Sequence, residues 1–235
     1  ATHRREGGSR VMTMAQRLHE VTERIERAKL AAGRTDNISL MAVSKTHPIE
    51  AVEEAVACGQ LLFGENRVQE IQQKFSGEER TYEVHLIGHL QSNKVRKAVS
   101  LVDAIDSVDS PKLLRLVDSE AARIGKVLPV LLEWNTSKER AKSGFTDERE
   151  YFETLEEACA MRSVRIEGLM TIGPLSDDER QVRAAFARLR ELAIESSRRF
   201  PELDFSTLSM GMSQDFPWAI LEGSTVVRVG TAIFG

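Results

Sequence analysis

A lysine directly behind an apolar segment is the residue of this sequence best placed for nucleophilic chemistry. Residues 38–43 form an apolar run typical of a β-strand, and Lys45 follows it with only Ser44 between. We expect the stem of Lys45 to rise beside the end of this strand and to hold the amine in a partly dry place. Desolvation favours the neutral amine, which is the form that attacks aldehydes. Position alone also fits a solvated lysine that precedes a helix.

A second set of residues, near the C-terminus, suits phosphate binding. The segments 209–213 (SMGMS) and 230–231 (Gly-Thr) each follow an apolar run. Glycines let the backbone approach an anion closely, hydroxyl groups donate to it, and a helix that starts there presents unpaired N–H groups. Gly230 alone fits a tight turn equally well, but Ser213, Gly230 and Thr231 together predict a phosphate site. With Lys45 at one side of a pocket mouth and this site at the other, the predicted ligand is a phosphorylated aldehyde.

The remaining reactive side chains do not indicate a metal or redox site. Cys58 and Cys159 lie far apart, each inside a helix-like stretch, and match no metal or redox spacing. We interpret both as buried, small apolar residues of a protein in the reducing cytoplasm. His85 and His89 are four residues apart, but the residues between them indicate a strand end and a turn. They therefore do not predict a metal-binding helix face.

Alternating strand-like and helix-like segments must position these residues. The strand-like runs are 38–43, 61–63, 84–87, 102–105, 127–133, 165–170, 205–208 and 226–229. An opening helix is predicted from apolar residues at three- and four-residue spacing between positions 18 and 32. Further helix-like stretches are 48–58, 68–75, 94–99, 111–124, 148–161, 178–199 and 214–221. Pro48 and Pro111 suit first-turn positions, because proline lacks only a donor that would be unpaired there.

This alternation predicts an α/β fold built on a closed barrel. Continuous apolar runs with helices between them are typical of parallel strands buried on both faces. Eight such runs favour a single (β/α)8 TIM barrel, for which 235 residues lie in the lower part of the range. A doubly wound open sheet is the alternative, but the sequence lacks the glycine-rich phosphate motifs typical of that fold. We expect one domain over residues 14–235, after a flexible N-terminal segment of residues 1–13.

Functional side chains of such a barrel gather where strands end and helices begin. Polar, small or basic residues follow the predicted strands at 44–46, 64–67, 88–94, 107, 135, 171–173, 209–213 and 228–231. One polar loop is ordinary, but eight sets at one rim predict a pocket.

Composition argues against several classes of function. Lys and Arg number 32 and Asp and Glu number 36, so the formal net charge is -4 at pH 7. This disfavours nucleic-acid binding by bulk electrostatics, and we interpret the basic patch of Lys94, Arg96 and Lys97 as a solvated helix face. No apolar run approaches the roughly 18 residues of a membrane span. The first ten residues are polar and basic and do not indicate a signal peptide. We therefore expect a cytoplasmic protein with no membrane or nucleic-acid partner.

Six strings of the sequence resemble the YggS/PROSC family of pyridoxal 5'-phosphate (PLP) homeostasis proteins. They are AVSKTHP (42–48), FGENRVQE (63–70), HLIGHLQSNK (85–94), GLMTIGP (168–174), LSMGMSQDFPWAI (208–220) and STVVRVGTAIFG (224–235). Their order and spacing match the family from about residue 14 to residue 235. The resemblance implies a single barrel similar to the N-terminal domain of bacterial alanine racemase. This sequence departs from the family at Trp134, where relatives more often carry a small residue before the asparagine. The departure affects the expected pocket wall after the fifth strand.

The resemblance also implies a role for particular residues. It implies a Schiff base between PLP and Lys45, phosphate binding by Ser213, Gly230 and Thr231, a pocket position for Asn66, and an arginine, Arg228, that faces the pyridine nitrogen. A guanidinium can only donate, so the nitrogen facing Arg228 must accept and stay unprotonated. An unprotonated ring is a weaker electron sink than a pyridinium. Strong carbanion chemistry is therefore not expected.

A PLP carrier or regulator is the function that this resemblance implies. A racemase needs a second acid or base on the opposite face of the substrate. In alanine racemase this group is a tyrosine from a β-rich second domain of the partner subunit, whereas this sequence reaches Gly235 directly after the eighth strand. We interpret Tyr82 and Tyr151 as scaffold residues. The expectation is a monomer that buffers PLP and delivers it to PLP-dependent apo-enzymes, without strong catalytic activity.

Two enzymatic alternatives stay open at this point. One is a fold-type III, PLP-dependent amino-acid racemase, and the other is a lysine aldolase that acts on a phosphosugar without PLP. Lys138 and Lys142, near the rim after the fifth strand, are candidates for transient PLP sites, although ordinary surface lysines are the favoured interpretation.

Overall fold

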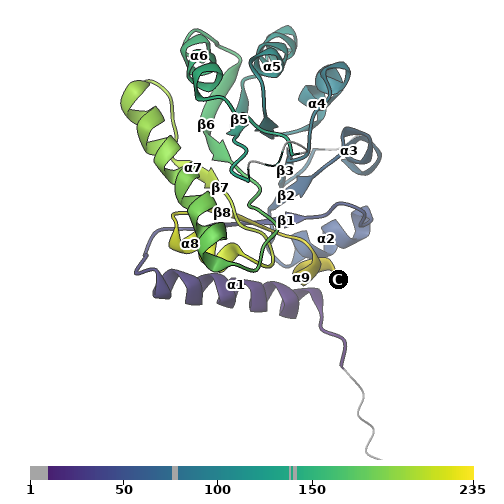
Figure 1. Ribbon diagram of the computed structural model, residues 1–235. Helices are drawn as coiled ribbons and strands as arrows, with labels where there is room; N and C mark the ends of the chain where they lie inside the picture. The colour runs from purple at the N-terminus through teal and green to yellow at the C-terminus, as the bar shows by residue number, and fades with distance from the viewer. Residues whose placement is uncertain (1–9, 76–78, 138, 140–141) are drawn as a thin grey trace, which may run out of the picture.

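The structure is a computed structural model that describes residues 10–75, 79–137, 139 and 142–235. Its eight strands pair in chain order into a closed barrel in which all neighbours are parallel (Figure 1). Helices surround the barrel, and an N-terminal helix precedes it. The predicted (β/α)8 barrel is confirmed. None of the helices among the described residues is long and apolar enough to cross a membrane.

The strands lie close to the predicted runs. They are β1 (Ser39–Val43), β2 (Leu62–Glu65), β3 (Glu83–Leu86), β4 (Ala104–Val108), β5 (Leu128–Glu133), β6 (Val164–Met170), β7 (Thr207–Ser209) and β8 (Val226–Val229). The largest difference concerns β4, which begins two residues later than predicted and extends to Val108. Its polar residues Asp106 and Ser107 are buried in the barrel wall, so they belong to the strand although their polarity is typical of a loop.

The helices cover the outside of the barrel in the predicted order. They are α1 (Met14–Ala31), α2 (Ile49–Ala57), α3 (Val68–Phe75), α4 (Val95–Leu101), α5 (Pro111–Arg123), α6 (Glu148–Ala158), α7 (Glu179–Arg199), α8 (Phe216–Leu221) and α9 (Thr231–Phe234), with a 3-10 turn, η1 (Ser92–Lys94), before α4. Pro111 is the first residue of α5, as predicted, but Pro48 caps α2 from outside its first turn. The short α9 was not predicted.

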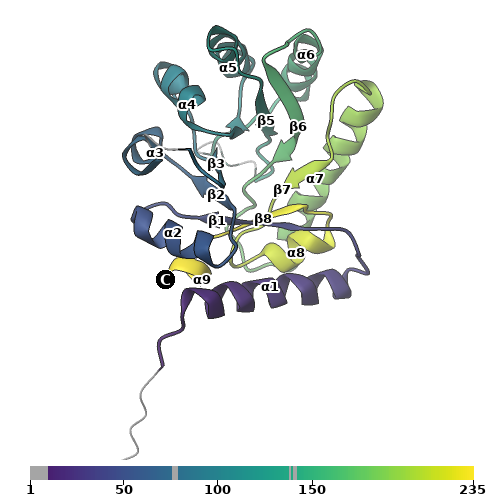
Figure 2. The same cartoon turned by 180° about the vertical axis from the view of Figure 1, so that it is seen from behind.

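Helix α1 closes one side of the molecule. A capping box starts it: the Thr13 hydroxyl accepts from the Gln16 N–H at 3.2 Å, and the Gln16 side chain accepts from the Thr13 N–H at 2.8 Å. Such a cap stabilises a helix by about 1 kcal/mol. The buried stripe of Leu18, Val21 and Ile25 then packs toward α8 and α9, beside which α1 runs in both views (Figures 1 and 2). The N-terminal helix thereby supports the elements that follow β7 and β8.

Side chains fill the barrel, so it is a packed core and not a channel. Met41, Val43 and Ile87 form a buried cluster against which Leu62 packs. Gly64 lies at the same level, and a Cβ there would come within 2.6 Å of the Met41 sulfur. The absence of a side chain at Gly64 therefore leaves room for the Met41 side chain.

The prediction for the cysteines is wrong, whereas that for the tyrosines is confirmed. Cys58 and Cys159 are exposed, because each directly follows the last residue of its helix instead of lying on the apolar stripe. Tyr151 is fully buried in α6 and its hydroxyl is hydrogen-bonded to Ser196 at 2.8 Å. Tyr82 precedes β3 and packs edge-on against Phe63. Both tyrosines are scaffold residues.

Candidate functional site

Lys45 lies in a turn at the carboxyl end of β1. The buried Ser44 follows the strand, and its carbonyl accepts from the His47 N–H at 3.1 Å across the turn. Thr46 has φ of 67°, in the left-handed region that residues other than glycine rarely occupy. Lys45 itself is exposed at the rim, so the expectation that its amine lies in a partly dry place is wrong. The turn carries the side chain above the packed interior, where solvent reaches it.

The start of α9 lies directly beside this turn. Because the barrel closes between β8 and β1, the last strand is the neighbour of the first. A Cβ added to Gly230 would lie 3.3 Å from the carbonyl oxygen of Val43, and the His47 ring stacks on Phe234 at 5.0 Å between centroids. The expectation that Lys45 and the phosphate candidates occupy opposite sides of the mouth is therefore corrected. Gly230 and Thr231 follow β8, the neighbour of β1, and Ser213 follows β7, the next strand along.

The donors around α9 and the loop after β7 suit a phosphate group. Among the residues that the structure describes, the N–H groups of Thr231 and Ala232 make no hydrogen bond. Ser213 is half-buried in the loop between β7 and α8. Gly211, with φ of 99°, starts this loop, and a Cβ there would come within 2.7 Å of the Ala219 side chain. Two free N–H groups, a hydroxyl and a glycine-dependent approach are a donor set that fits an anion.

Asn66 contributes an unsatisfied polar atom to the same rim. It follows β2, and its Oδ1 is buried without a hydrogen-bond partner among the described residues. Gly88, at the end of β3, lies so close that a Cβ there would come within 2.2 Å of the Asn66 carbonyl oxygen. Buried polar atoms in native proteins nearly always have a partner. An unpartnered side-chain atom here fits a ligand that supplies one.

Arg228 is a buried cation on β8. Only 3% of the residue is exposed, and its guanidinium donates to the Ser209 hydroxyl at 2.8 Å and to the Thr171 carbonyl at 2.9 Å. Burial lowers the pKa of the guanidinium, and the negative charge of three acidic residues opposes this shift: Asp106, Glu133 and Asp215. Since an arginine is a donor at any relevant pH, the group offers N–H donors to whatever approaches it.

A charged network inside the barrel accompanies Arg228, and sequence reasoning missed it. His85 contacts Asp106 at 3.0 Å and Glu83 at 3.1 Å. Burial opposes the charge of His85, but the two carboxylates outweigh burial and raise its pKa to about 10. Burial raises the pKa of Glu133 to about 7, although Ser143 donates to that carboxyl. The sequence carries one sign of this network, which is the acidic Asp106 inside the largely apolar strand β4 (AIDSV).

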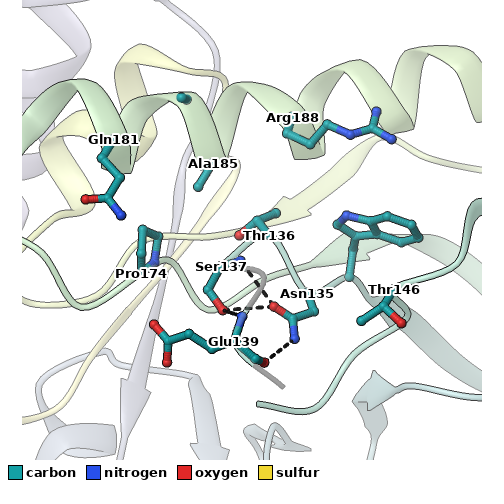
Figure 3. A pocket seen from close by; sticks show the side chains of 11 residues that line it. Asn135, Thr136, Ser137, Glu139, Thr146, Pro174, Gln181, Ala185 and Arg188 are labelled. Carbon is teal, nitrogen blue, oxygen red and sulfur yellow. Dashed lines mark hydrogen bonds between the residues drawn. The ribbon is translucent and has the colours of Figure 1, made fainter. Parts of the chain in front are cut away.

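A hollow outside the barrel mouth lies away from Lys45. It has a volume of about 720 Å³ and opens between α7 and the loops that follow β5 and β6. Figure 3 shows Gln181 and Arg188 of α7 on one side and the loop residues Asn135 and Ser137 on the other. It contains none of the predicted cofactor residues, and the hydrogen-bond chemistry described above lies elsewhere. We therefore place the candidate site at the Lys45 rim.

The departure at Trp134 belongs to this outer hollow. The Trp134 ring packs edge-on against Tyr151 at 5.6 Å, on the helix side of β5. It therefore shapes the outer wall and leaves the Lys45 rim unaffected. Lys142 is half-buried, with its amine 3.3 Å from the Gly173 carbonyl oxygen, and Lys138 lies outside the described residues.

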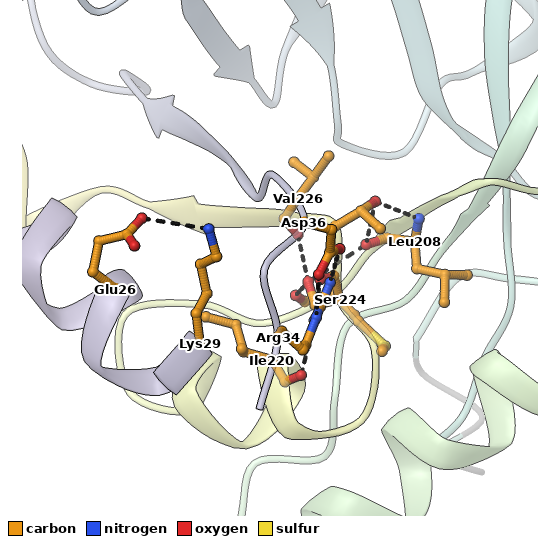
Figure 4. Close-up of polar contacts among 10 residues, drawn as sticks. Glu26, Lys29, Arg34, Asp36, Leu208, Ile220, Ser224 and Val226 are labelled. Carbon is orange, nitrogen blue, oxygen red and sulfur yellow. Dashed lines mark hydrogen bonds and ion pairs between the residues drawn. The ribbon is translucent and has the colours of Figure 1, made fainter. Parts of the chain in front are cut away.

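Arg34 holds the other end of the β1–β8 pair in register. Its guanidinium forms an ion pair with Asp36 and donates to the carbonyl groups of Ile220, at 2.9 Å, and Ser224, at 2.8 Å (Figure 4). The segment before β1 is thereby tied to the segment before β8. This arrangement supports the strand alignment that places Lys45 beside α9.

Comparison with known proteins identifies the family. The alanine racemase N-terminal domain family matches residues 17–235. The "pyridoxal phosphate homeostasis protein" of Aquifex aeolicus (strain VF5) is 41% identical over 95% of this chain and 98% of its own length. The protein of the same name from Vibrio alginolyticus is 40% identical over 95% and 97%, respectively.

Solved structures agree with this assignment. PipY of Synechococcus elongatus PCC7942, at 38% identity, has a TM-score of 0.85 without PLP and 0.82 with PLP bound, and each comparison covers 95% of this chain and 100% of PipY. Alanine racemase of Clostridium difficile 630, at 14% identity, shares the fold with a TM-score of 0.71 over 93% of this chain and 57% of the enzyme. The chain therefore belongs to the family of pyridoxal phosphate homeostasis proteins, which is built on the fold of the alanine racemase N-terminal domain.

Proposed function

We propose that this protein binds PLP through a Schiff base on Lys45 and serves vitamin B6 homeostasis. The observation that carries the proposal is the closure of the barrel between β8 and β1, which puts Lys45 beside the free N–H groups of α9. An amine and an anion site on neighbouring strands suit a small phosphorylated aldehyde. Among relatives of this chain, PipY has been solved with PLP bound.

The proposed binding roles follow the chemistry of each side chain. Lys45 is the Schiff-base lysine, Ser213, Gly230 and Thr231 bind the phosphate, Asn66 contacts the ligand at the rim, and Arg228 faces the pyridine nitrogen. PLP supplies an aldehyde whose carbon forms a C=N bond with the Lys45 amine while the aldehyde oxygen leaves as water with both amine hydrogens. Arg228 would offer a donor to the ligand, and the donors of α9 and of the loop after β7 would orient it.

The surroundings of the two tyrosines and of Arg228 favour a carrier or regulator over a racemase. Tyr151 is buried, hydrogen-bonded and has a raised pKa because of burial, and Tyr82 packs against aromatic rings. Neither tyrosine of the chain is therefore available as the second acid or base. A guanidinium partner also keeps the pyridine nitrogen unprotonated, which weakens the ring as an electron sink. We infer a cytoplasmic monomer that buffers PLP and releases it to apo-enzymes.

An absorbance titration with PLP tests the proposal. Purified protein should develop a Schiff-base band that Lys45→Ala abolishes, while Lys142→Ala, at another lysine near the rim, retains it. Amino-acid racemisation should stay far below the turnover of ordinary enzymes, whose median kcat is about 10 per second. Turnover in that range would establish the racemase instead. A colourless protein that reacts covalently with a phosphosugar would establish the aldolase.

A further inference from the structure

A nearly buried ammonium group lies beneath the turn that carries Lys45. Lys74 comes from α3, and only 10% of its side chain is exposed. Its amine donates to the carbonyl of Ser44 at 2.8 Å and to the carbonyl of His47 at 2.7 Å. These two carbonyls stand on either side of Lys45 in the chain. One cation therefore holds both ends of the turn together.

Two carboxylates complete this contact. Glu65, at the end of β2, is fully buried and lies 2.5 Å from the Lys74 amine, and it also accepts from the Ser44 hydroxyl at 2.6 Å. Burial raises the pKa of Glu65, while its bonds with Lys74 and Ser44 oppose that shift. Glu70, one helical turn before Lys74, lies 3.2 Å from the same amine. The ammonium thus links the turn to both β2 and α3.

Glu70 also fixes the unusual backbone of the turn. It accepts from the Thr46 N–H at 2.5 Å, and Thr46 is the residue with φ of 67°. A left-handed conformation at a β-branched residue persists only where the surrounding structure holds it. Among the described residues, Thr46 is the only one other than glycine with positive φ. The strained residue is thus the neighbour of Lys45, and the Glu70–Lys74 pair holds it.

We propose that Lys74 is a positioning residue for Lys45, holding the 44–47 turn so that the Lys45 amine meets a ligand bound at the start of α9. This inference rests on the proposed function and deepens it. Lys74 acts through main-chain carbonyls and through Glu70, and it touches neither Lys45 nor the ligand site. Without its charge, the turn would lose two hydrogen bonds at once and Glu70 would lose its cation, so Thr46 would be free to leave the left-handed region.

Lys126 supplies a matched control. Its amine also donates to two main-chain carbonyls, those of Val99 at 2.9 Å and Val102 at 2.6 Å, but it lies before β5, at the opposite end of the barrel. Lys74→Met and Lys126→Met each remove one ammonium that joins two main-chain carbonyls. Lys74→Met should cost more stability, because it also leaves the buried Glu65 without its cation. Only Lys74→Met should change the Lys45 turn.

The experiment combines amide hydrogen exchange without PLP and Schiff-base formation with PLP. Lys74→Met should speed exchange at the Thr46 and His47 amides by about tenfold or more and weaken Schiff-base formation on Lys45 by a similar factor. Lys74→Arg, which still donates to both carbonyls, should recover most of the loss. Lys126→Met should match the wild type in both readouts.

The outcomes separate this inference from the proposed function. A wild-type protein that forms no Schiff base on Lys45 overturns both. A Schiff base that forms normally in the wild type and equally well in Lys74→Met overturns the positioning role alone. If Lys74→Met does not fold, Glu70→Ala serves instead, since it removes the acceptor of the Thr46 N–H from the surface of α3. Unchanged exchange at Thr46 in that variant would then overturn the inference.

Discussion

The imidazole of His47 stacks on the ring of Phe234, with centroids 5.0 Å apart and planes inclined by 27°. This contact joins the turn after the first strand to the helix after the last one, although 187 positions separate the two residues in the sequence. It brings the nucleophile candidate and the proposed phosphate site into one rigid rim.

Removing this stack should loosen the rim more than the fold. Phe234→Ala is expected to lower the free energy of unfolding by about 1 kcal/mol, the worth of one aromatic pair with some burial. PLP should dissociate faster because α9 is no longer held against the 44–47 turn. Denaturant unfolding and the rate of PLP loss on dilution measure the two effects. An unchanged rate of PLP loss would show that the stack does not support the site.

The buried His85 should make stability fall in mildly alkaline solution. Burial opposes the charge of His85, but Asp106 and Glu83 outweigh burial and raise its pKa from 6.5 to about 10. Between these two pH values, the folded state therefore holds a proton that the unfolded state has lost. The contribution is complete below pH 6.5 and disappears as pH rises through about 10, with a slope of at most about 1.4 kcal/mol per pH unit. His85→Gln should flatten this part of the stability profile. An unchanged slope in the variant would contradict the assignment.

Glu133 should act in a lower pH window. Burial raises the pKa of its carboxyl from 4.5 to about 7, so the folded state again holds the extra proton. Stability from this group is complete below pH 4.5 and is lost as pH rises toward 7. Between pH 4.5 and pH 8, the free energy of unfolding of the wild type should therefore fall by more than that of Glu133→Gln. A parallel profile for the two proteins would refute the prediction.

Loss of the cation on β8 should be costly. Arg228→Gln would leave Asp106, Glu133 and Asp215 without the guanidinium that they face, and removal of one partner of a buried charge network costs about 3 kcal/mol. Arg183→Gln is the control, because Arg183 pairs with Glu222 at the surface, where an ion pair contributes less than about 1 kcal/mol. Urea unfolding of both variants checks the difference. Equal losses would mean that the buried cluster is not held by Arg228.

The sequence was sufficient for the architecture because the barrel repeats one pattern. Most strands are largely apolar runs, and most helices carry a stripe at helical spacing, so both periods are visible without tertiary information. The rim positions followed from the strand ends, which is why Lys45, Asn66 and Gly230 could be named in advance.

Other features depend on contacts between distant segments. Four residues of α9 are too few to show a helical period, and the polar end of β4 is buried only because the barrel encloses Asp106 and Ser107. Thr46 adopts a left-handed backbone although it is not glycine, and the sequence does not indicate this. The bonds of Lys74 to the 44–47 turn cross from α3 to β1, and no local pattern in the sequence announces them.

The proposed Schiff base on Lys45 is tested by locating the residue that carries PLP. Protein mixed with PLP is reduced with borohydride, digested, and its peptides are mapped by mass. The reduced pyridoxyl group should lie on the peptide that contains Lys45 and should be lost in Lys45→Ala. A label found mainly on another lysine, such as Lys142, or no label at all, would contradict it.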